Sequence, residues 1–199
     1  MLQRDKSLLL VGLTLVALFN YLIVQKLQAL FPSLSYTAGL LIPWLCIALV
    51  LVGIYWRTSG IIFDKNLLVR NWLRIVLYAG LILCGLLIFV FLGLTKYFQY
   101  VQYPVLFFLW IPIIEELIFR GWIYGTLEKF GLHAVLFSSI LFALHHLQYS
   151  HFHLSLFVLF QIGYTFVLGL ILAKIRRLSG SIYLGILLHI FINLITLKL

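Results

Sequence analysis

The sequence predicts an all-α membrane protein: a polytopic bundle of about seven transmembrane helices (six to eight) with its amino terminus inside. Of the 199 residues, 64% are hydrophobic and 10% are charged, and the mean hydropathy is +1.16. Charged residues normally make up about a quarter of a soluble chain. The apolar runs take up most of the sequence and leave no room for a separate soluble domain. We therefore interpret residues 1–199 as a single membrane domain.

Seven apolar runs define the expected helices, since a membrane-spanning helix needs about 20 apolar residues. They are Ser7–Val24, Tyr36–Trp56, Ile75–Leu94, Tyr103–Leu127, Leu132–Leu147, Leu154–Ala173 and Ser181–Leu197. The first run and the short fifth run are the two whose limits can be drawn differently. The segment between the second and third runs is expected to be a basic loop, because it carries Arg57, Lys65, Arg70 and Arg74 against a single Asp64.

The positive charges alternate between the two sides of this arrangement. With the amino terminus inside, three lysines fall in outer segments: Lys26, Lys96 and Lys198. The inner segments hold Arg4, Lys6, Arg57, Lys65, Arg70, Arg74, Lys129, Lys174, Arg176 and Arg177. Such a bias is the positive-inside rule, which orients membrane proteins. The net charge of +9 therefore indicates topology in a cell membrane, with lipid as the surroundings, and no nucleic-acid partner is expected.

Three ionisable side chains lie inside the fourth run: Glu115, Glu116 and Arg120. A charged residue at the centre of a membrane helix costs roughly 2.5–3.5 kcal/mol on insertion scales, so these side chains are expected to face the protein interior. Glu116 and Arg120 have the i,i+4 spacing of a helical ion pair. Glu115 points about 100° away and has no partner on its own helix. We expect Glu115 to act as a general base, and the ion pair to support it. The alternative is an interhelical salt-bridge cluster without chemistry.

Two further features of the apolar runs carry expectations. Pro112 removes the backbone hydrogen bond to the carbonyl of Phe108, which predicts a kink that admits water beside Glu115. Cys46 and Cys84 are far apart in sequence and have no metal-ligand neighbours. They are expected to be buried as small hydrophobic side chains.

Three of the six histidines, His145, His146 and His189, carry the most weight because they lie well inside apolar runs, and Asn193 follows His189 by one helical turn. Depth in the membrane can be compared at about 1.5 Å per residue. The two glutamates then lie about 15 Å from the inner end of their helix, His146 about 20 Å, and His189 and Asn193 about 12 and 18 Å. This shared layer predicts that the three helices contribute to one site.

The residue types in that layer limit the chemistry. No serine or cysteine has a suitable base, so nucleophilic catalysis by those residues finds no support. The sequence has no HExxH motif, so a thermolysin-like zinc site is not indicated. A carboxylate with histidines can activate water, or bind a metal that activates it. His189 and Asn193 can donate hydrogen bonds to a tetrahedral oxyanion. The expected reaction is hydrolysis of an amide bond.

Three motifs occur in order: Glu115-Glu116-x-x-x-Arg120, Phe142-x-x-x-His146 and His189-x-x-x-Asn193. They resemble the motifs of the CPBP family (CAAX proteases and bacteriocin-processing proteins, also called Abi), a family of intramembrane endopeptidases that includes the type II CAAX prenyl endopeptidase. The resemblance covers residues 102–197, which would form the catalytic core. The preceding residues match only as generic apolar helices.

The resemblance implies a role for each matching residue. Glu115 with His146 would activate the attacking water, while His189 with Asn193 would stabilise the oxyanion. The family leaves the need for a metal open. A divalent ion such as zinc, if one binds, would use Glu115, His146 and His189.

The remaining polar residues of the motif region have lesser expected roles. Glu116 and Arg120 would support the site. His145 is extra to the motif and is interpreted either as a neighbour that tunes His146 or as a packed polar residue, of which the second is favoured. His151 and His153 are expected at the outer membrane boundary.

The sequence thus predicts an intramembrane endopeptidase that cleaves a membrane-associated peptide or small membrane protein. By the resemblance, bacteriocin processing or self-immunity in a bacterium is favoured over maturation of prenylated proteins. The alternative is a membrane immunity or regulatory protein that binds a partner without cutting it. A transporter is a weaker possibility, because intramembrane Glu, Arg and His also serve proton relays, but no internal repeat is present.

Overall fold

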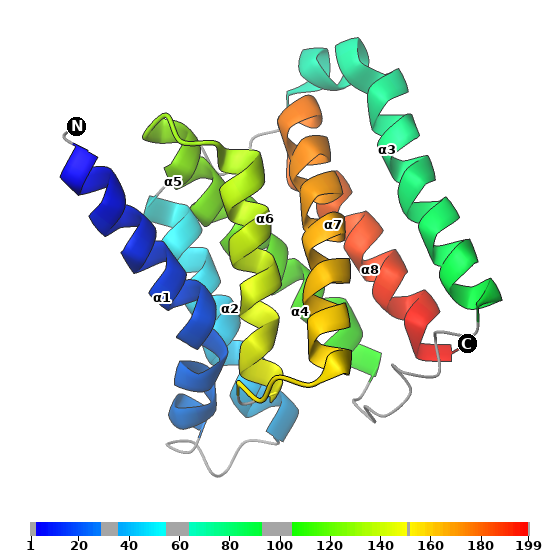
Figure 1. Ribbon diagram of the computed structural model, residues 1–199. Helices are drawn as coiled ribbons and strands as arrows, with labels where there is room; N and C mark the ends of the chain where they lie inside the picture. The colour runs from blue at the N-terminus through cyan, green and yellow to red at the C-terminus, as the bar shows by residue number, and fades with distance from the viewer. Residues whose placement is uncertain (1–2, 29–35, 55–63, 93–104, 151, 199) are drawn as a thin grey trace.

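A computed structural model describes residues 3–28, 36–54, 64–92, 105–150 and 152–198, and every element in these ranges is helical (Figure 1). The α-helices are α1 (Gln3–Gln28), α2 (Tyr36–Ile54), α3 (Lys65–Phe91), α4 (Val105–Glu116), α5 (Tyr124–Lys129), α6 (Ala134–His145), α7 (Leu156–Ser179) and α8 (Tyr183–Lys198). A π-helical segment, η2 (Leu117–Ile123), joins α4 to α5, and a short 3₁₀ segment, η3 (His146–Ser150), follows α6. The predicted all-α class is confirmed.

The rod made of α4, η2 and α5 lies at the centre of the bundle. Helices α1 and α2 pack against each other, α1 also contacts α6, and α2 contacts η2. On the other side, α4 packs against α8, and α6 packs against α7. Helix α3 lies at the edge of the bundle and packs mainly on α7 (Figure 1). The central rod therefore has neighbours from both halves of the chain.

The expected basic loop before the third helix is partly wrong. Helix α3 begins at Lys65, so Arg70 and Arg74 lie on a helix, whereas Arg57 is outside the described residues. Asp64 supplies the reason: its side chain accepts a hydrogen bond from the backbone N–H of Leu67 at 3.0 Å and so caps the helix. A capping aspartate fixes a helix start ahead of the apolar run.

Among the residues that the structure describes, two helices are long and apolar enough to cross a membrane, Lys65–Ile88 and Leu156–Ser179. Four shorter apolar helices fall at Lys6–Asn20, Leu41–Leu51, Ala134–Gln148 and Tyr183–Ile195. Large apolar side chains are exposed along α3 and α7, including Phe91 at 88% and Leu156 at 85%. Water-soluble monomers rarely expose such contiguous apolar surface. The seven-span count and the inside amino terminus remain predictions.

The two cysteines are not buried as expected. Cys46 on α2 and Cys84 on α3 are both free and exposed. A helix that is apolar on all sides gives no sequence signal for which side faces the bundle. Both thiols therefore lie among the exposed apolar side chains of their helices.

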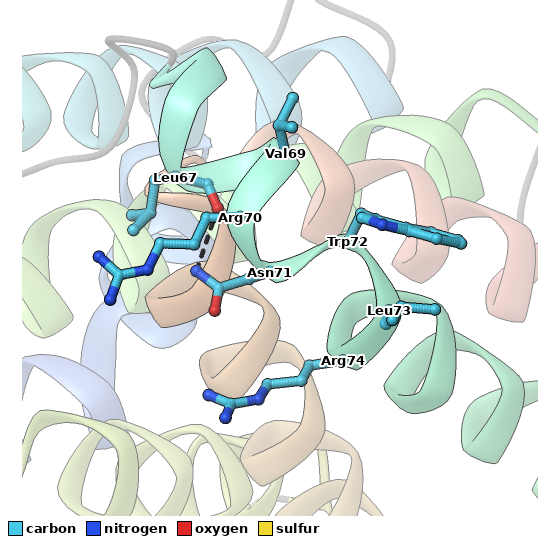
Figure 2. Close-up of a pocket in the computed structure, with 7 residues that line it drawn as sticks. All are labelled: Leu67, Val69, Arg70, Asn71, Trp72, Leu73 and Arg74. Atoms are coloured by element: carbon cyan, nitrogen blue, oxygen red, sulfur yellow. Dashed lines mark hydrogen bonds between the residues drawn. The ribbon is translucent and has the colours of Figure 1, made fainter.

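A hollow of about 450 Å³ lies along the amino-terminal part of α3 (Figure 2). Its lining includes Arg70, Asn71, Trp72 and Arg74, and the Asn71 amide donates to the carbonyls of Leu67 and Leu178 at 3.0 and 3.1 Å. These hydrogen bonds attach α3 to the end of α7. None of the predicted site residues, such as Glu115, His146 and His189, lines this hollow.

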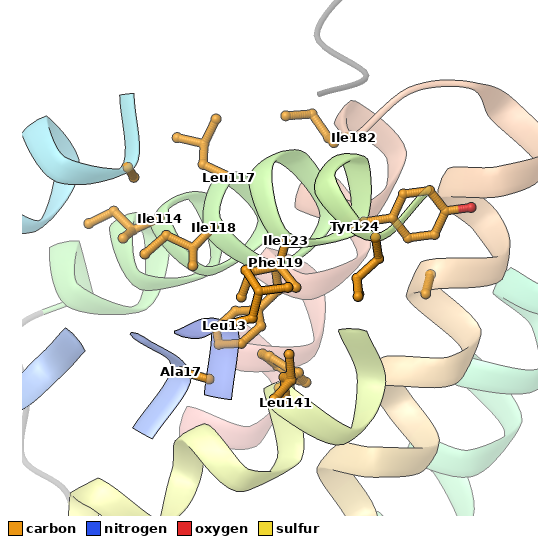
Figure 3. Packing of buried hydrophobic residues seen from close by; sticks show 14 of the residues in the cluster. Leu13, Ala17, Ile114, Leu117, Ile118, Phe119, Ile123, Tyr124, Leu141 and Ile182 are labelled. Atoms are coloured by element: carbon orange, nitrogen blue, oxygen red, sulfur yellow. The ribbon is translucent and has the colours of Figure 1, made fainter. Parts of the chain in front are cut away.

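The apolar core surrounds the central rod (Figure 3). Ile114, Ile118 and Phe119 are completely buried, and Leu13 and Ala17 of α1 pack in the same cluster. Burial of an apolar side chain contributes about 1.5–3 kcal/mol. The core thus holds the rod in a fixed rotation, which determines where its charged side chains point.

Candidate active site

Glu115 and Glu116 are the last two residues of α4, and the backbone changes to a π-helix directly after them. Their exposures are 2% and 0%, and Arg120, within the π-helical segment, is also completely buried. Short π-helical segments within α-helices are frequently found at functional sites. The predicted burial of all three charged side chains inside the protein is confirmed.

Pro112 lies inside α4, and the helix continues past it for one more turn. The departure from α-helical geometry comes after the glutamates, where the backbone N–H of Tyr124 reaches the carbonyl of Phe119. In the sequence, Pro112 signals an irregular helix before Glu115. The π-helical segment that follows Glu116 in the structure was not predicted.

The ion pair predicted from the i,i+4 spacing is present. Arg120 Nη1 lies 3.2 Å from Glu116 Oε1, and Arg120 Nη2 donates to the backbone carbonyl of Gly169 on α7 at 3.4 Å. The guanidinium also lies over the ring of Phe142, 4.1 Å from its centroid. A buried charge is costly unless it is paired and hydrogen-bonded. Glu116 and Arg120 therefore connect the central rod to α6 and α7.

Two imidazoles flank the carboxylate of Glu115. His145 Nε2 lies 3.3 Å from Glu115 Oε1, and His189 Nε2 lies 3.6 Å from Glu115 Oε2. The three side chains come from α4, α6 and α8, and each is at most 5% exposed. The expected convergence of an acid and imidazoles from separate helices is thus found in the structure.

His189 also connects the two glutamates to each other. Its Nδ1 lies 3.1 Å from Glu116 Oε1, while its Nε2 faces Glu115. Gly185, one turn earlier on α8, makes room for this arrangement, because a Cβ there would come within 2.9 Å of Glu116 Oε2. Close packing of α8 on α4 thus depends on the missing side chain of Gly185.

Phe142 lies at the centre of the aromatic part of the site. Its ring centroid is 5.0 Å from that of His146, 5.7 Å from that of His189 and 5.2 Å from that of Phe119, all nearly edge-to-face. Edge-to-face packing is the favoured geometry for such rings. The phenylalanine of the Phe142-x-x-x-His146 motif is therefore a packing centre for the imidazoles and for Arg120.

His146 and Asn193 are the other two predicted catalytic residues, and their positions differ from that of His145. His146 is the first residue after α6, and its Nδ1 lies 2.9 Å from the carbonyl of Phe142. Its ring is 5.6 Å from that of His145. Asn193 lies one turn after His189 on α8 and is half-buried. His153 is exposed, and His151 lies outside the described residues.

The favoured interpretation of His145 as a packed polar residue is incomplete, because this buried histidine also contacts Glu115 directly. Sequence reasoning also missed Asn20 of α1, Trp44 of α2 and Gln148 of η3, which surround the far side of His145. The signals for two of them were an uncharged amide inside the first apolar run, Asn20, and one directly after the fifth run, Gln148. Trp44 gave none.

Glu115, His146 and His189 are the residues expected to hold a metal ion, if one binds. In the part of the chain that the structure describes, no three His, Cys, Asp or Glu side chains are grouped so that they could hold an ion. The predicted set of Glu115, His146 and His189 is therefore not arranged as a metal site here. Glu115 is instead engaged by His145 and His189. No chemical step below is assigned to a metal.

The arrangement suits proton transfer in a site that excludes water. A carboxylate held between imidazoles can take a proton from a bound water molecule, and the negative charge then passes to the oxygen of the attacked carbonyl. His189 can donate through Nε2 when both its nitrogens carry hydrogen, since Nδ1 faces Glu116. These groups together can support attack of water on a carbonyl.

Comparison with known proteins agrees with this geometry. A family model described as "Type II CAAX prenyl endopeptidase Rce1-like" matches residues 79–195. The match begins within α3, earlier than the start at residue 102 expected for the core, and it contains all three motifs. No individual protein of curated description and no solved structure matches the chain. Because the match covers more than half of the sequence, the chain belongs to the Rce1-like family of membrane-embedded type II CAAX prenyl endopeptidases.

Proposed function

We propose that this protein is an intramembrane endopeptidase that hydrolyses a peptide bond of a membrane-associated peptide or small membrane protein. One observation carries the proposal: the Glu115 carboxylate is buried between the Nε2 atoms of His145 and His189, at 3.3 and 3.6 Å. A buried carboxylate between imidazoles has little structural advantage over apolar packing. A general base that activates water does need such a carboxylate, so catalysis gives a reason for its burial.

In the proposed reaction, Glu115 removes a proton from water as the water oxygen attacks the scissile carbonyl carbon. Two histidines hold the Glu115 carboxylate in position as it accepts the proton: His145 of α6, which contacts it, and His146 of η3, the motif residue that follows His145. His189 and Asn193 donate hydrogen bonds to the oxyanion. The proton then passes to the amine as the C–N bond breaks, so no covalent enzyme intermediate is required.

The family favours a lipid-exposed or prenylated peptide as substrate. By the resemblance of the three motifs to those of the CPBP family, we favour bacteriocin processing or self-immunity as the setting. We propose that the chain crosses the cell membrane several times with its amino terminus in the cytoplasm. An extended peptide would then enter either from the cytoplasmic side or between helices.

The test compares Glu115→Gln with wild type in vesicles that contain a farnesylated peptide ending in a CAAX sequence, and in cells that co-express a hydrophobic bacteriocin precursor. Loss of cleavage by Glu115→Gln at unchanged protein level supports the endopeptidase. Glu128→Gln is the matched control, because Glu128 is an exposed glutamate on α5. If cells that produce Glu115→Gln are as resistant to the bacteriocin as cells that produce wild type, the protein would be a binding protein instead.

Treatment of the purified protein with a chelator tests separately whether the cleavage activity needs a metal ion. Activity that is lost after chelation and restored by zinc would support ligation of an ion by Glu115, His146 and His189, with rearrangement of the contacts described above. Activity that survives chelation supports water activation by Glu115 and the histidines without a removable ion.

A further inference from the structure

The two consecutive histidines of α6 and η3 face different partners. The motif residue His146 directs Nδ1 back to the Phe142 carbonyl of its own helix, at 2.9 Å. The additional residue His145 directs Nε2 at Glu115, at 3.3 Å, and is completely buried. His145 is therefore an imidazole in direct contact with the proposed general base, although no motif includes it.

The other nitrogen of His145 faces α1. Its Nδ1 lies 3.1 Å from the Asn20 amide nitrogen and 3.1 Å from the Ala17 carbonyl oxygen. The Gln148 amide nitrogen is within hydrogen-bonding reach of the same atom. Donors and an acceptor thus both surround Nδ1, in a region that is closed to solvent.

The orientation of the Asn20 amide is determined by its neighbours. Its nitrogen donates to the carbonyls of Val16 and Ala17 at 2.8 and 3.0 Å. Its oxygen accepts from the indole N–H of Trp44 on α2 at 3.1 Å, and Trp44 is completely buried. Reversing the amide would lose all three hydrogen bonds, so the nitrogen is the atom that faces His145.

These contacts have one consequence for the His145 ring. When only one nitrogen carries hydrogen, the single lone pair of Nδ1 accepts from the amide of Asn20 or of Gln148, with Asn20 sharing its two hydrogens between Nδ1 and the carbonyls of Val16 and Ala17, and the hydrogen of the ring lies on Nε2. When both carry hydrogen, Nδ1 donates to the Ala17 carbonyl and Nε2 still carries hydrogen. In both states Nε2–H points at Glu115. A buried polar network with satisfied partners specifies one arrangement of its members.

We propose that Asn20 and Trp44 are positioning residues that hold His145 against Glu115, so that helices α1 and α2 complete the active site. This inference rests on the proposed function for its catalytic meaning, but its structural part does not. Both residues lie outside the stretch matched by the Rce1-like family model, which begins at residue 79. The network runs from α2 through α1 and α6 to α4 and ends on the carboxylate that is proposed to activate water.

The first test is spectroscopic and needs no substrate. The full-length protein is labelled with ¹⁵N-histidine in detergent micelles, and the solvent-protected Nε2–H proton of His145 is assigned by its loss in His145→Gln. We expect this resonance to be displaced or lost in Asn20→Leu and in Trp44→Phe, which keeps most of the ring packing. Unchanged resonances in both variants would overturn the proposal.

The controls carry the same substitutions at other sites. Asn71→Leu removes an amide that joins α3 to α7, and Trp72→Phe alters an exposed indole on α3. Both are expected to leave the His145 resonance in place, even if Asn71→Leu lowers the melting temperature. An equal displacement in Asn71→Leu would mean that the effect reports only general loosening, and the proposal would be wrong.

The second test measures cleavage of any peptide that wild type processes. Asn20→Leu and Trp44→Phe are expected to lower kcat by about 10- to 100-fold with little change in KM, since misplacing a catalytic group acts on the chemical step. Retained kcat would contradict the positioning role. If instead Glu115→Gln still cleaves, the proposed function fails, while the resonance measurements still decide whether the network holds His145.

Discussion

Gly185 of α8 lies directly against the carboxylate of Glu116, so close that an added Cβ would stand 2.9 Å from Oε2. The same carboxylate is bound through Oε1 to Arg120 and to His189, at 3.2 and 3.1 Å. Because Gly185 has no side chain, the Glu116 carboxylate can lie against α8 and still contact both Arg120 and His189.

Gly185→Ala should lower both stability and activity. Added volume at a tight contact typically costs about 1–3 kcal/mol, and here it would push a carboxylate that cannot move without losing its partners. Gly163→Ala on α7 is the control, because nothing lies within 4 Å of its Cβ position. That change should be neutral or stabilising by about 0.5–1 kcal/mol through helix propensity. Thermal melting followed by circular dichroism in detergent measures both, and equal melting temperatures for the two variants would contradict the steric argument.

Arg120→Met should destabilise the protein by about 3–5 kcal/mol, because it leaves the completely buried Glu116 without its cation. The double variant Glu116→Gln/Arg120→Met should recover part of this loss, since it removes both charges. A double-mutant cycle on the free energy of unfolding measures the coupling. Strictly additive effects would show that the pair contributes nothing beyond the packing of each side chain.

Arg120→Lys tests the remaining contacts of the guanidinium. Lysine keeps the charge but cannot reproduce both the hydrogen bond to the Gly169 carbonyl and the contact with the Phe142 ring. We expect a smaller loss of stability than in Arg120→Met. Stability equal to that of wild type would show that only the charge matters.

Gly180→Ala should cost more than Gly131→Ala, although both glycines have the same backbone conformation, with φ of 66° and 65°. A left-handed conformation costs an alanine about 1–2 kcal/mol in either place. Gly180 ends α7, and its Cβ would also meet Leu67 of α3 at 2.9 Å, whereas Gly131 has open space. Melting temperatures of the two variants separate the steric contribution from the backbone contribution. Identical shifts would show that α3 yields freely at this contact.

Asn193→Ala should lower kcat by about 10²–10³ if its amide donates to the oxyanion, with KM much less affected. Asn66→Ala is the control, because Asn66 is an exposed residue on α3. Steady-state kinetics on a processed peptide distinguishes the two variants. A change confined to KM would assign Asn193 to substrate binding rather than to the oxyanion.

The part of the site that follows from local helix geometry was predictable. Spacing alone places Glu116 beside Arg120, and the structure has that ion pair. The polar residues of three apolar helices could be assigned to one group because each is too costly to face lipid. Glu115 and His189 accordingly meet in the structure.

The choice between His145 and His146 could not be made from the sequence in the same way. Consecutive residues on a helix point about 100° apart, and only the rotation of α6 against α1 and α4 determines which one reaches Glu115. Trp44 is similarly invisible, since a tryptophan in an apolar run gives no sign that its N–H has an amide partner on another helix. The early start of α3 was obscured by its basic residues, although Asp64 was a usable capping signal.

The π-helical stretch from Leu117 to Ile123 has a consequence for how this chain can change in length. A π-helical turn holds one residue more than an α-helical turn, so removing one residue there would restore ordinary helical winding and would leave Tyr124–Lys129 close to their present rotation relative to the two glutamates. A single-codon deletion inside this stretch would thus be absorbed locally, whereas the same deletion within the regular helices α6 or α7 would rotate every residue after it by about 100°.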